Sequence, residues 1–359
     1  MKLKKGAAMK VLLLGEFSGF FKYLKLGLQD NGVEVDWYAS EDSFKKIKGM
    51  NGDIMGNTGV KIWDKILFPI CLVSRLKGYD VVQLVNPWIF SPWINAYLIK
   101  KLKRNNKLLC VSAVGTDYNV YKYQKQEQRK YDYYLLDECK DYDVYYAKKS
   151  KYIRDHEKVI KYCDAIIPGS YEYALAYQDN KKTTPIVHYP IDLTGVKYKR
   201  NVVSGKIVFF HGLSRETFKG TKYIREAMEM LKKKYPDDVE IIIDGRMPFD
   251  KYLDVMDKAN VVLDQCRSYG VGINALIAMA QGKVVLSGAE QGGVEDYENC
   301  PVFNITPDSK QIFCVLEQIV LQKEKIALWG EQSRMYVEKY HDRKKQAAEY
   351  LKAWETLNC

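Results

Sequence analysis

Short apolar segments alternate with longer segments of helical periodicity along almost the whole chain. Such short runs suit strands that are buried on both faces of a parallel sheet. The predicted strands are residues 11–14, 33–37, 81–85, 108–114, 165–168 and 186–188, then 207–210, 239–243, 261–263, 284–286 and 302–304. The predicted helices between and after them include residues 18–30, 94–103, 219–234 and 309–323. This alternation predicts an α/β protein with parallel, doubly wound sheets.

The strand series starts again after residue 200, and a chain of 359 residues is long enough for two domains. We therefore predict Rossmann-like domains at residues 1–200 and 201–330, followed by a C-terminal helical segment at 331–359. One face of residues 334–354 is apolar, which suits either a helix packed across both domains or an ordinary terminal amphipathic helix. Residues 118–162 break the alternation and form a predicted helical insertion rich in Tyr and Lys.

The formal net charge of +11 is concentrated in the first domain. Residues 1–200 hold 34 Lys and Arg against 22 Asp and Glu, whereas residues 201–359 hold 22 and 23. An anionic partner is therefore expected for the first domain only.

The cysteine spacing and the hydropathy of the chain indicate in which cellular compartment the protein works. The eight cysteines form no CxxC pair, which is typical of free thiols in a reducing compartment. The apolar run near the N-terminus is too short for a signal peptide, and no run reaches the roughly 18 apolar residues of a membrane span. We expect a cytoplasmic protein, either soluble or peripheral on the inner face of the cell membrane.

The loop after the first predicted strand contains Gly15, Glu16, Ser18 and Gly19. Ligands of open α/β sheets bind at the carboxyl ends of the strands, so this loop is predicted either to line a cleft or only to turn the chain. It matches neither the GxGxxG fingerprint nor a Walker sequence. NAD and FAD are therefore not expected, and no cofactor is predicted.

The loop after the strand at 207–210 places Arg215 and Lys219 beside a predicted helix start. A bidentate cation, a point charge and a helix dipole all attract phosphate. The alternative is a pair of solvated surface cations. One histidine, His211, does not make a metal site, and none is predicted.

A second turn, at residues 264–274, contains Gly270 and Gly272 and opens a helix that ends at Gly282. Free amide groups at such a helix start can hold a diphosphate.

These loops resemble those of GT-B glycosyltransferases of the group 1 (family 4) type. The resemblance is carried by Gly-x-x-Arg-x-x-x-Lys-Gly at residues 212–220, by Gly-x-Gly at 270–272, and by the residues at 278–285 and 292–295. Residues 115–117 and 190–192 in the first half also match. The resemblance covers most of the chain and is weakest across residues 118–162.

The resemblance implies two facing Rossmann-like domains, with a last helix that crosses back to the first. It implies a nucleotide-sugar donor held by the second domain, as substrate, and an acceptor held by the first. Arg215 and Lys219 would then bind the donor diphosphate and neutralise the departing nucleotide without a metal. Asp117 is the nearest candidate for contacting sugar or acceptor hydroxyls, although Asp after a strand is also a common helix cap. The remaining donor-binding candidates are Gly212, Asp244, Gly245, Arg246, Gly270, Gly272, Ile273, Asn274 and Glu295.

The chain departs from this family at its Glu-x7-Glu motif, where it carries Tyr269 and Ile277. We expect a hexosyltransferase-like enzyme that moves a sugar to a glycan or lipid-linked acceptor, in surface polysaccharide biosynthesis. The alternatives are an inactive GT-B scaffold that binds nucleotide or glycan, and a GT-B enzyme of another reaction such as epimerisation.

The Tyr- and Lys-rich residues 118–162 could meet an anionic membrane or a lipid-linked acceptor, or could form a solvated face of mixed charge. Nucleic acid is not expected, because no known binding module is present. Asp141 and Asp143 match the spacing of an Asp-x-Asp metal motif but lie in a predicted helix, which favours a solvated face.

Overall fold

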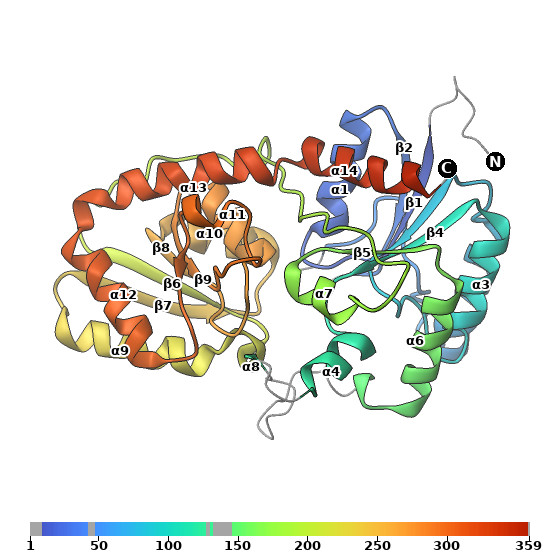
Figure 1. Ribbon diagram of the computed structural model, residues 1–359, viewed down its shortest axis with the longest axis horizontal. Helices are drawn as coiled ribbons and strands as arrows, with labels where there is room; N and C mark the ends of the chain where they lie inside the picture. The colour runs from blue at the N-terminus through green and yellow to red at the C-terminus, as the bar shows by residue number, and fades with distance from the viewer. Residues whose placement is uncertain (1–8, 42–46, 127–129, 132–145, 358–359) are drawn as a thin grey trace. The chain divides into compact units, whose positions relative to one another are not determined.

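The computed structural model describes residues 9–41, 47–126, 130–131 and 146–357. The chain forms two compact units (Figure 1). Unit 1 comprises Met1–Gln126, Tyr142–Pro190 and Arg343–Cys359, and unit 2 comprises Glu127–Asp141 and Ile191–Asp342. Apart from the segment at residues 127–141, the chain changes unit after Pro190 and again after Asp342, whereas the sequence placed limits at residues 200 and 330.

Unit 1 contains a five-stranded parallel sheet in the order β2-β1-β3-β4-β5. Its strands are β1 (Lys10–Leu14), β2 (Glu34–Tyr38), β3 (Val81–Leu84), β4 (Leu108–Ala113) and β5 (Ala165–Pro168). Every residue of β3, β4 and β5 is buried, as expected for strands covered on both faces. Its helices are α1 (Phe20–Asp30), η2 (Trp63–Leu67), α2 (Phe68–Arg75), α3 (Asn95–Asn105), α4 (Tyr118–Gln124), α6 (Ser150–Tyr162), α7 (Tyr171–Ala176) and α14 (Arg343–Thr356).

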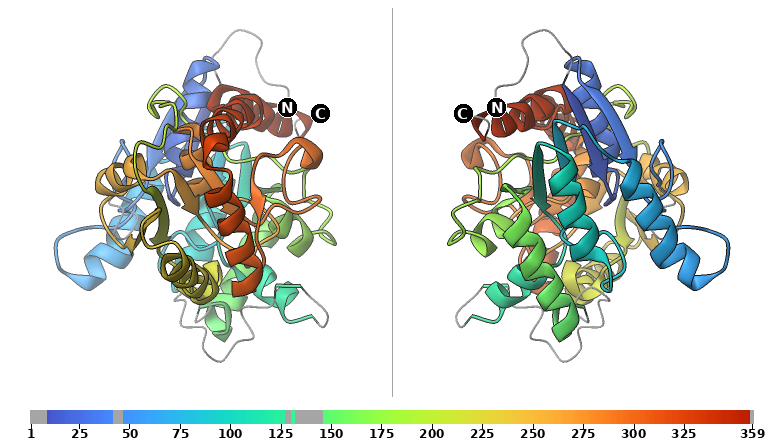
Figure 2. Two further views of the ribbon diagram at one scale, coloured as in Figure 1. Left: turned by 90° about the vertical axis from the view of Figure 1, so that its left-hand side faces the viewer. Right: turned by 90° about the vertical axis from the view of Figure 1, so that its right-hand side faces the viewer.

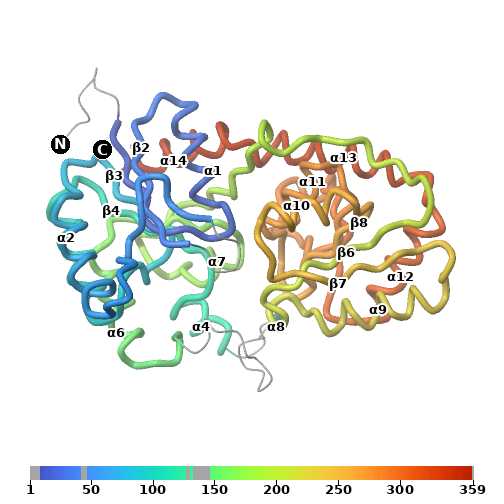
Figure 3. Tube along the Cα trace, turned by 180° about the vertical axis from the view of Figure 1, so that it is seen from behind, coloured from blue at the N-terminus to red at the C-terminus, as the bar shows by residue number. Residues whose placement is uncertain are grey.

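Unit 2 repeats this topology, with a parallel sheet in the order β10-β9-β8-β6-β7 (Figure 3). Its strands are β6 (Ile207–Leu213), β7 (Val239–Gly245), β8 (Val261–Leu263), β9 (Val284–Ser287) and β10 (Phe303–Asn304). Its helices are α8 (Glu216–Lys219), α9 (Thr221–Lys234), α10 (Phe249–Lys258), α11 (Ile273–Ala280), α12 (Ser309–Leu321) and α13 (Ile326–Tyr340), with short turns η4 (Tyr297–Asn299) and η5 (Lys323–Lys325). Side chains such as Phe209, Ile224 and Leu286 form its core.

In both sheets the strand order reverses beside the first strand of the unit. The switch point lies between β1 and β3 in unit 1 and between β6 and β8 in unit 2. Loops on the two sides of such a point leave the sheet in opposite directions and open a crevice at the carboxyl ends of the strands. The loops that follow β6 and β8 are therefore where unit 2 should hold a ligand.

Two sequence predictions are wrong. Residues 186–188 are not a strand: Val187 donates one backbone hydrogen bond to Pro168, and Pro185 and Pro190 flank the segment without amide hydrogens to extend a ladder. The predicted continuous helix at residues 334–354 ends at Tyr340 and starts again at Arg343. The break carries the chain from unit 2 to unit 1, where α14 packs along α1.

The close approach of α14 to α1 depends on Gly27. A Cβ atom at this position would lie 2.1 Å from the carbonyl oxygen of Arg343. Polar contacts add to the packing, since Asn31 donates to the carbonyl of Lys344 and Arg343 pairs with Asp30 at 2.7 Å. The last helix thus belongs to the first unit, as the resemblance implied. Among the described residues, no helix is both long and apolar enough to cross a membrane.

Candidate functional site

The loops on either side of the switch point in unit 2 are joined by a buried ion pair. Lys219, at the end of α8, places its Nζ atom 2.7 Å from Oδ1 of Asp264, which follows β8 directly. Both side chains are less than a tenth exposed. The other carboxylate oxygen, Oδ2, accepts a hydrogen bond from the Gly272 amide at 3.3 Å. Lys219, Asp264 and Gly272 therefore connect the loop after β6 to the start of α11.

Arg215 lies four residues before Lys219, in the turn between β6 and α8. Its guanidinium stacks on the ring of Phe218, 4.1 Å from the ring centre, and the side chain is half-buried. Stacking fixes the plane of the guanidinium without using its hydrogen-bonding edge. The loop thus holds two cations that differ in kind, a buried ammonium with a carboxylate partner and a stacked guanidinium.

His211 fixes the end of β6 from inside the unit. Nδ1 lies 2.9 Å from the carbonyl oxygen of Leu263, and Nε2 lies 2.9 Å from the hydroxyl of Thr221. A carbonyl only accepts, so Nδ1 carries the proton and Nε2 accepts from Thr221. Burial, with the nearby charge of Lys219, lowers the pKa of His211 to about 4. The ring is therefore neutral and serves as a structural bridge between β6, β8 and α9.

The turn before α11 is packed backbone against backbone. A Cβ atom on Gly270 would lie 2.1 Å from the carbonyl oxygen of Gly293, and one on Gly293 would lie 1.9 Å from that of Tyr269. Gly272 precedes Ile273 as the cap of α11 and has no side chain with which to cap the helix. Its amide already donates to the Asp264 carboxylate, so an anionic ligand at this helix start would have to meet the other amides of the first turn or replace Asp264.

The two positions of the family's Glu-x7-Glu motif differ in their surroundings. Ile277 is fully buried within α11. Tyr269 meets the ring of Tyr131 edge-on, with 5.0 Å between the ring centres. A carboxylate that sequence reasoning missed, Glu290, lies beside this turn: its amide donates to the Tyr269 carbonyl, and its side chain accepts from Tyr131 and Lys130.

Neither Asp264 nor Glu290 was predicted as a site residue from the sequence, although the sequence contains a signal for Asp264. Asp264 is the polar residue that follows the apolar run at 261–263, at the carboxyl end of a strand. Glu290 left none, because its partners lie about 160 residues earlier in the chain.

The other predicted donor residues lie in neighbouring loops of unit 2. Gly212 is packed against Tyr252, and Gly245 lies against the backbone of Leu213. Exposed Asp244 is the second-to-last residue of β7, while Arg246 has a positive φ of 55° and pairs with Glu216 at 2.9 Å. Asn274 follows Ile273 in the first turn of α11. Glu295 accepts a hydrogen bond from the hydroxyl of Tyr336 in α13, at 2.9 Å.

In unit 1, the predicted cleft loop is organised by Glu16. Its two carboxylate oxygens accept from the amides of Gly19 and Lys22, at 2.8 and 3.0 Å, in the first turn of α1. Gly15, Ser18 and Gly19 all have positive φ angles, which bend the chain sharply after β1. An anionic ligand at this helix start would have to replace the Glu16 carboxylate.

Asp117 is fully buried at the start of α4. One carboxylate oxygen accepts from the Val120 amide at 2.9 Å, and the other accepts from the hydroxyl of Tyr177. It therefore caps a helix, and its contact with an acceptor stays a prediction. Asp141 and Asp143 lie outside the described residues. Among the described residues, no group of three His, Cys, Asp or Glu side chains could hold a metal ion.

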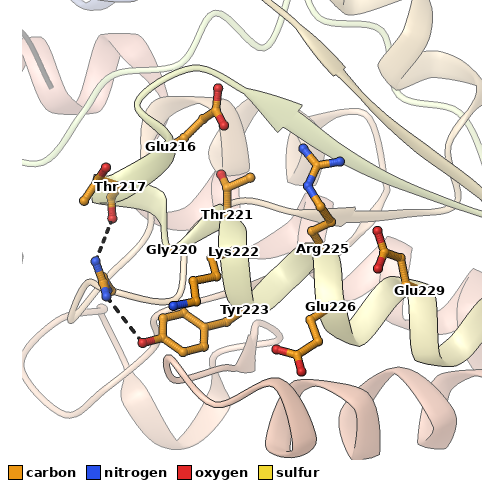
Figure 4. A pocket seen from close by; sticks show the side chains of 10 residues that line it. Glu216, Thr217, Gly220, Thr221, Lys222, Tyr223, Arg225, Glu226 and Glu229 are labelled. Carbon is orange, nitrogen blue, oxygen red and sulfur yellow. Dashed lines mark hydrogen bonds between the residues drawn. The ribbon is translucent and has the colours of Figure 1, made fainter. Parts of the chain in front are cut away.

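A surface groove of about 450 Å³ runs along α8 and α9 (Figure 4). Arg267 lines it and donates to the Thr217 carbonyl and the Tyr223 hydroxyl. The lining holds three carboxylates, Glu216, Glu226 and Glu229, and as many cations, Lys222, Arg225 and Arg267. The groove thus lacks the excess positive charge that a diphosphate requires, and we place no donor in it.

The fold of this chain matches known structures over almost their full length. No protein-family model matches the sequence, and no relative was found among curated proteins. Sucrose-phosphate synthase from Thermosynechococcus elongatus is similar at a TM-score of 0.63 and 14% identity, over 97% of this chain and 99% of that one.

Two other solved structures are similar to a comparable extent. WaaG, a glycosyltransferase involved in lipopolysaccharide biosynthesis, has a TM-score of 0.61 and 14% identity, over 95% of this chain and 99% of that one. Anabaena HepE in complex with UDP-glucose has a TM-score of 0.58 and 13% identity, over 96% and 100%. With two parallel five-stranded sheets and an α/β layout shared with these proteins, the chain has the GT-B glycosyltransferase fold.

Proposed function

We propose that this protein transfers a sugar from a nucleotide-sugar donor to a glycan or lipid-linked acceptor, in surface polysaccharide biosynthesis. The observation that carries the proposal is the switch point of unit 2, where Arg215, the Lys219–Asp264 pair and the start of α11 lie on loops that follow β6 and β8. The similarity to HepE, whose structure contains UDP-glucose, supports this choice of donor class.

The chemistry asks for stabilisation of a leaving diphosphate. The bond between the anomeric carbon and the phosphate oxygen breaks, the acceptor hydroxyl forms a new bond to that carbon, and its proton is released. Negative charge grows on the departing nucleotide, where Arg215 and the amides at the start of α11 would meet it. Lys219, whose charge is balanced by Asp264 in the structure, would meet the diphosphate by exchanging this partner. Because the chain itself supplies this charge, we propose a metal-independent, hexosyltransferase-like reaction without a cofactor.

Unit 1 would hold the acceptor, as its excess of positive charge favours an anionic acceptor or surface. We propose that the protein works in the cytoplasm, at the inner face of the cell membrane.

A second candidate is a scaffold that binds nucleotide or glycan without turnover. The replacement of both motif glutamates by Tyr269 and buried Ile277 favours it, because neither side chain can contact sugar hydroxyls as a carboxylate does. An epimerase is the third candidate. A panel of nucleotide sugars separates the three: transfer or donor hydrolysis supports the first, binding without turnover supports the second, and a changed sugar on the recovered nucleotide supports the third.

We expect Arg215→Ala to weaken donor binding by about 2–5 kcal/mol if the contact is desolvated. Isothermal calorimetry with a nucleotide sugar that the panel identifies measures this loss. The matched control is Arg104→Ala, which removes an exposed arginine from unit 1 and should leave donor affinity unchanged. Equal affinity of the Arg215→Ala variant and the unaltered chain would remove Arg215 from the donor site.

A further inference from the structure

The helix that precedes β3 is apolar on two sides. It runs from Lys61 through η2 into α2 and ends at Arg75. Pro69 and Val73 are buried in unit 1, as expected for the inner side of a surface helix. Ile62, Trp63 and Leu67 are exposed instead, Ile62 by 66%. Because a globular protein needs only one apolar stripe on a surface helix, the second side calls for a partner.

The neighbouring helix α3 and the residues before it add exposed aromatic side chains. Both α2 and α3 connect parallel strands of one sheet, so they run in the same direction, and Lys101 of α3 donates to Ser74 of α2 at 2.7 Å. Seven residues before these two along the chain lie Leu67, at the end of η2, and Ile94, the residue that precedes α3. Trp93 and Tyr97, which flank Ile94, are 77% and 62% exposed. Figures 2 and 3 place α2 at the outer edge of unit 1.

We define the apolar face as the six exposed residues that these two helices and the preceding loop present: Val60, Ile62, Trp63, Leu67, Trp93 and Tyr97.

Three lysines lie on or beside this apolar face. Lys61 and Lys65 are exposed on the same helix, and Lys151 lies over the ring of Trp93, 4.9 Å from its centre. The one acid in the helix, Asp64, accepts from the amides of Thr58 and Gly59 and from the Thr58 hydroxyl. These bonds hold its carboxylate at the neighbouring loop. The face therefore combines exposed tryptophan and aliphatic side chains with lysines, a composition that suits the boundary between lipid headgroups and acyl chains.

We propose that the apolar face binds anionic lipid membranes by lying in the interface. The tryptophan and aliphatic side chains enter the headgroup boundary, while the lysines pair with lipid phosphates. The sequence had pointed to residues 118–162 for this contact. In the structure the apolar side chains come from residues 60–67 and 93–97, and the basic segment contributes Lys151 at their border. A second copy of the chain is the competing occupant, which the lysines around the face disfavour.

Vesicle co-sedimentation of the full chain tests this proposal without any sugar substrate, so its result does not depend on the proposed transfer reaction. Vesicles of phosphatidylcholine with phosphatidylglycerol are compared with phosphatidylcholine alone. We expect binding to the anionic vesicles only, weakened by added salt. Trp63→Ser with Leu67→Ser should lower the partition coefficient about tenfold or more.

The matched control removes exposed apolar side chains from unit 2, as Leu328→Ser with Met335→Ser on α13. It should bind vesicles as the unaltered chain does. Circular dichroism shows whether each variant is folded, and light scattering gives its mass in solution. An equal loss in both double variants would overturn the proposal, and so would equal binding to neutral vesicles. A dimer in solution that Trp63→Ser with Leu67→Ser dissociates would assign the face to a second copy instead.

Discussion

At the scale of a single residue, the buried imidazole of His211 predicts how the stability of the protein depends on pH. Its pKa is lowered from 6.5 to about 4 in the folded chain, first by burial and then by the charge of Lys219. Below pH 6.5 the unfolded chain binds a proton here and the folded chain does not, so acid favours unfolding. We expect the free energy of unfolding to fall by about 3 kcal/mol from this group as the pH drops from about 6.5 to about 4.

Urea unfolding across this pH window measures the effect. Other groups titrate there too, including His156, whose pKa burial also lowers, so the comparison with His211→Gln isolates one ring. Glutamine keeps a donor for Leu263 and an acceptor for Thr221 but does not titrate. The variant should lose stability less steeply in acid than the unaltered chain. Parallel curves would show that His211 does not contribute.

Some site residues could be identified from the sequence and others could not, depending on whether the neighbouring sequence carries the signal. Arg215 and Lys219 could be singled out from the sequence because they follow an apolar run and precede a helix. The partner of Lys219 could not be identified in this way, since Asp264 lies 45 residues further along the chain. The pairing of β6 with β8 brings it close to Lys219. A loop's charge can thus be predicted from local sequence, but the neutralisation of that charge depends on the sheet.

At the scale of elements, the close packing of the turn at 268–272 on the loop at 288–293 predicts a steric effect. Gly270→Ala would press a methyl group against the Gly293 carbonyl, where only 2.1 Å is available. We expect the free energy of unfolding to fall by about 1–3 kcal/mol, because the two loops must separate. Thermal unfolding followed by circular dichroism measures it.

The matched control for this change is Gly205→Ala in the same unit, since a Cβ atom there meets nothing within 4 Å. It should leave stability unchanged or raise it slightly, because alanine restricts the unfolded chain. If both alanine variants lost the same stability, backbone entropy rather than the loop contact would account for the effect.

Most strands were predictable because buried parallel strands are continuous apolar runs. The residues at which helices and strands begin and end were harder to predict. The helix predicted at residues 219–234 divides at Gly220, whose φ of 70° is left-handed, and β6 continues through His211 and Gly212 because its partner β7 extends equally far. Residues 186–188 are as apolar as a strand but lack the hydrogen-bonding partners. Local pattern therefore sets the type of an element, and tertiary pairing sets its limits.

At the scale of the whole molecule, the packing of α14 predicts that the stability of unit 1 depends on the C-terminal helix. Trp354 is fully buried, and its indole nitrogen donates to Oε1 of buried Gln83 on β3, at 3.0 Å. Trp354→Ala would leave a cavity and an unpaired amide oxygen inside unit 1. We expect it to lower the free energy of unfolding of unit 1 by about 3–5 kcal/mol.

Hydrogen exchange followed by mass spectrometry locates this loss along the chain. Amides of β1 and β3 should exchange faster in Trp354→Ala, while those of β6 and β8 keep their rates, because α14 packs within unit 1. Trp93→Ala, which removes an indole that is 77% exposed, is the matched control and should leave exchange unchanged in both units. Faster exchange of β6 and β8 in the Trp354→Ala variant would mean that the two units unfold together, so that the last helix stabilises the whole chain rather than unit 1 alone.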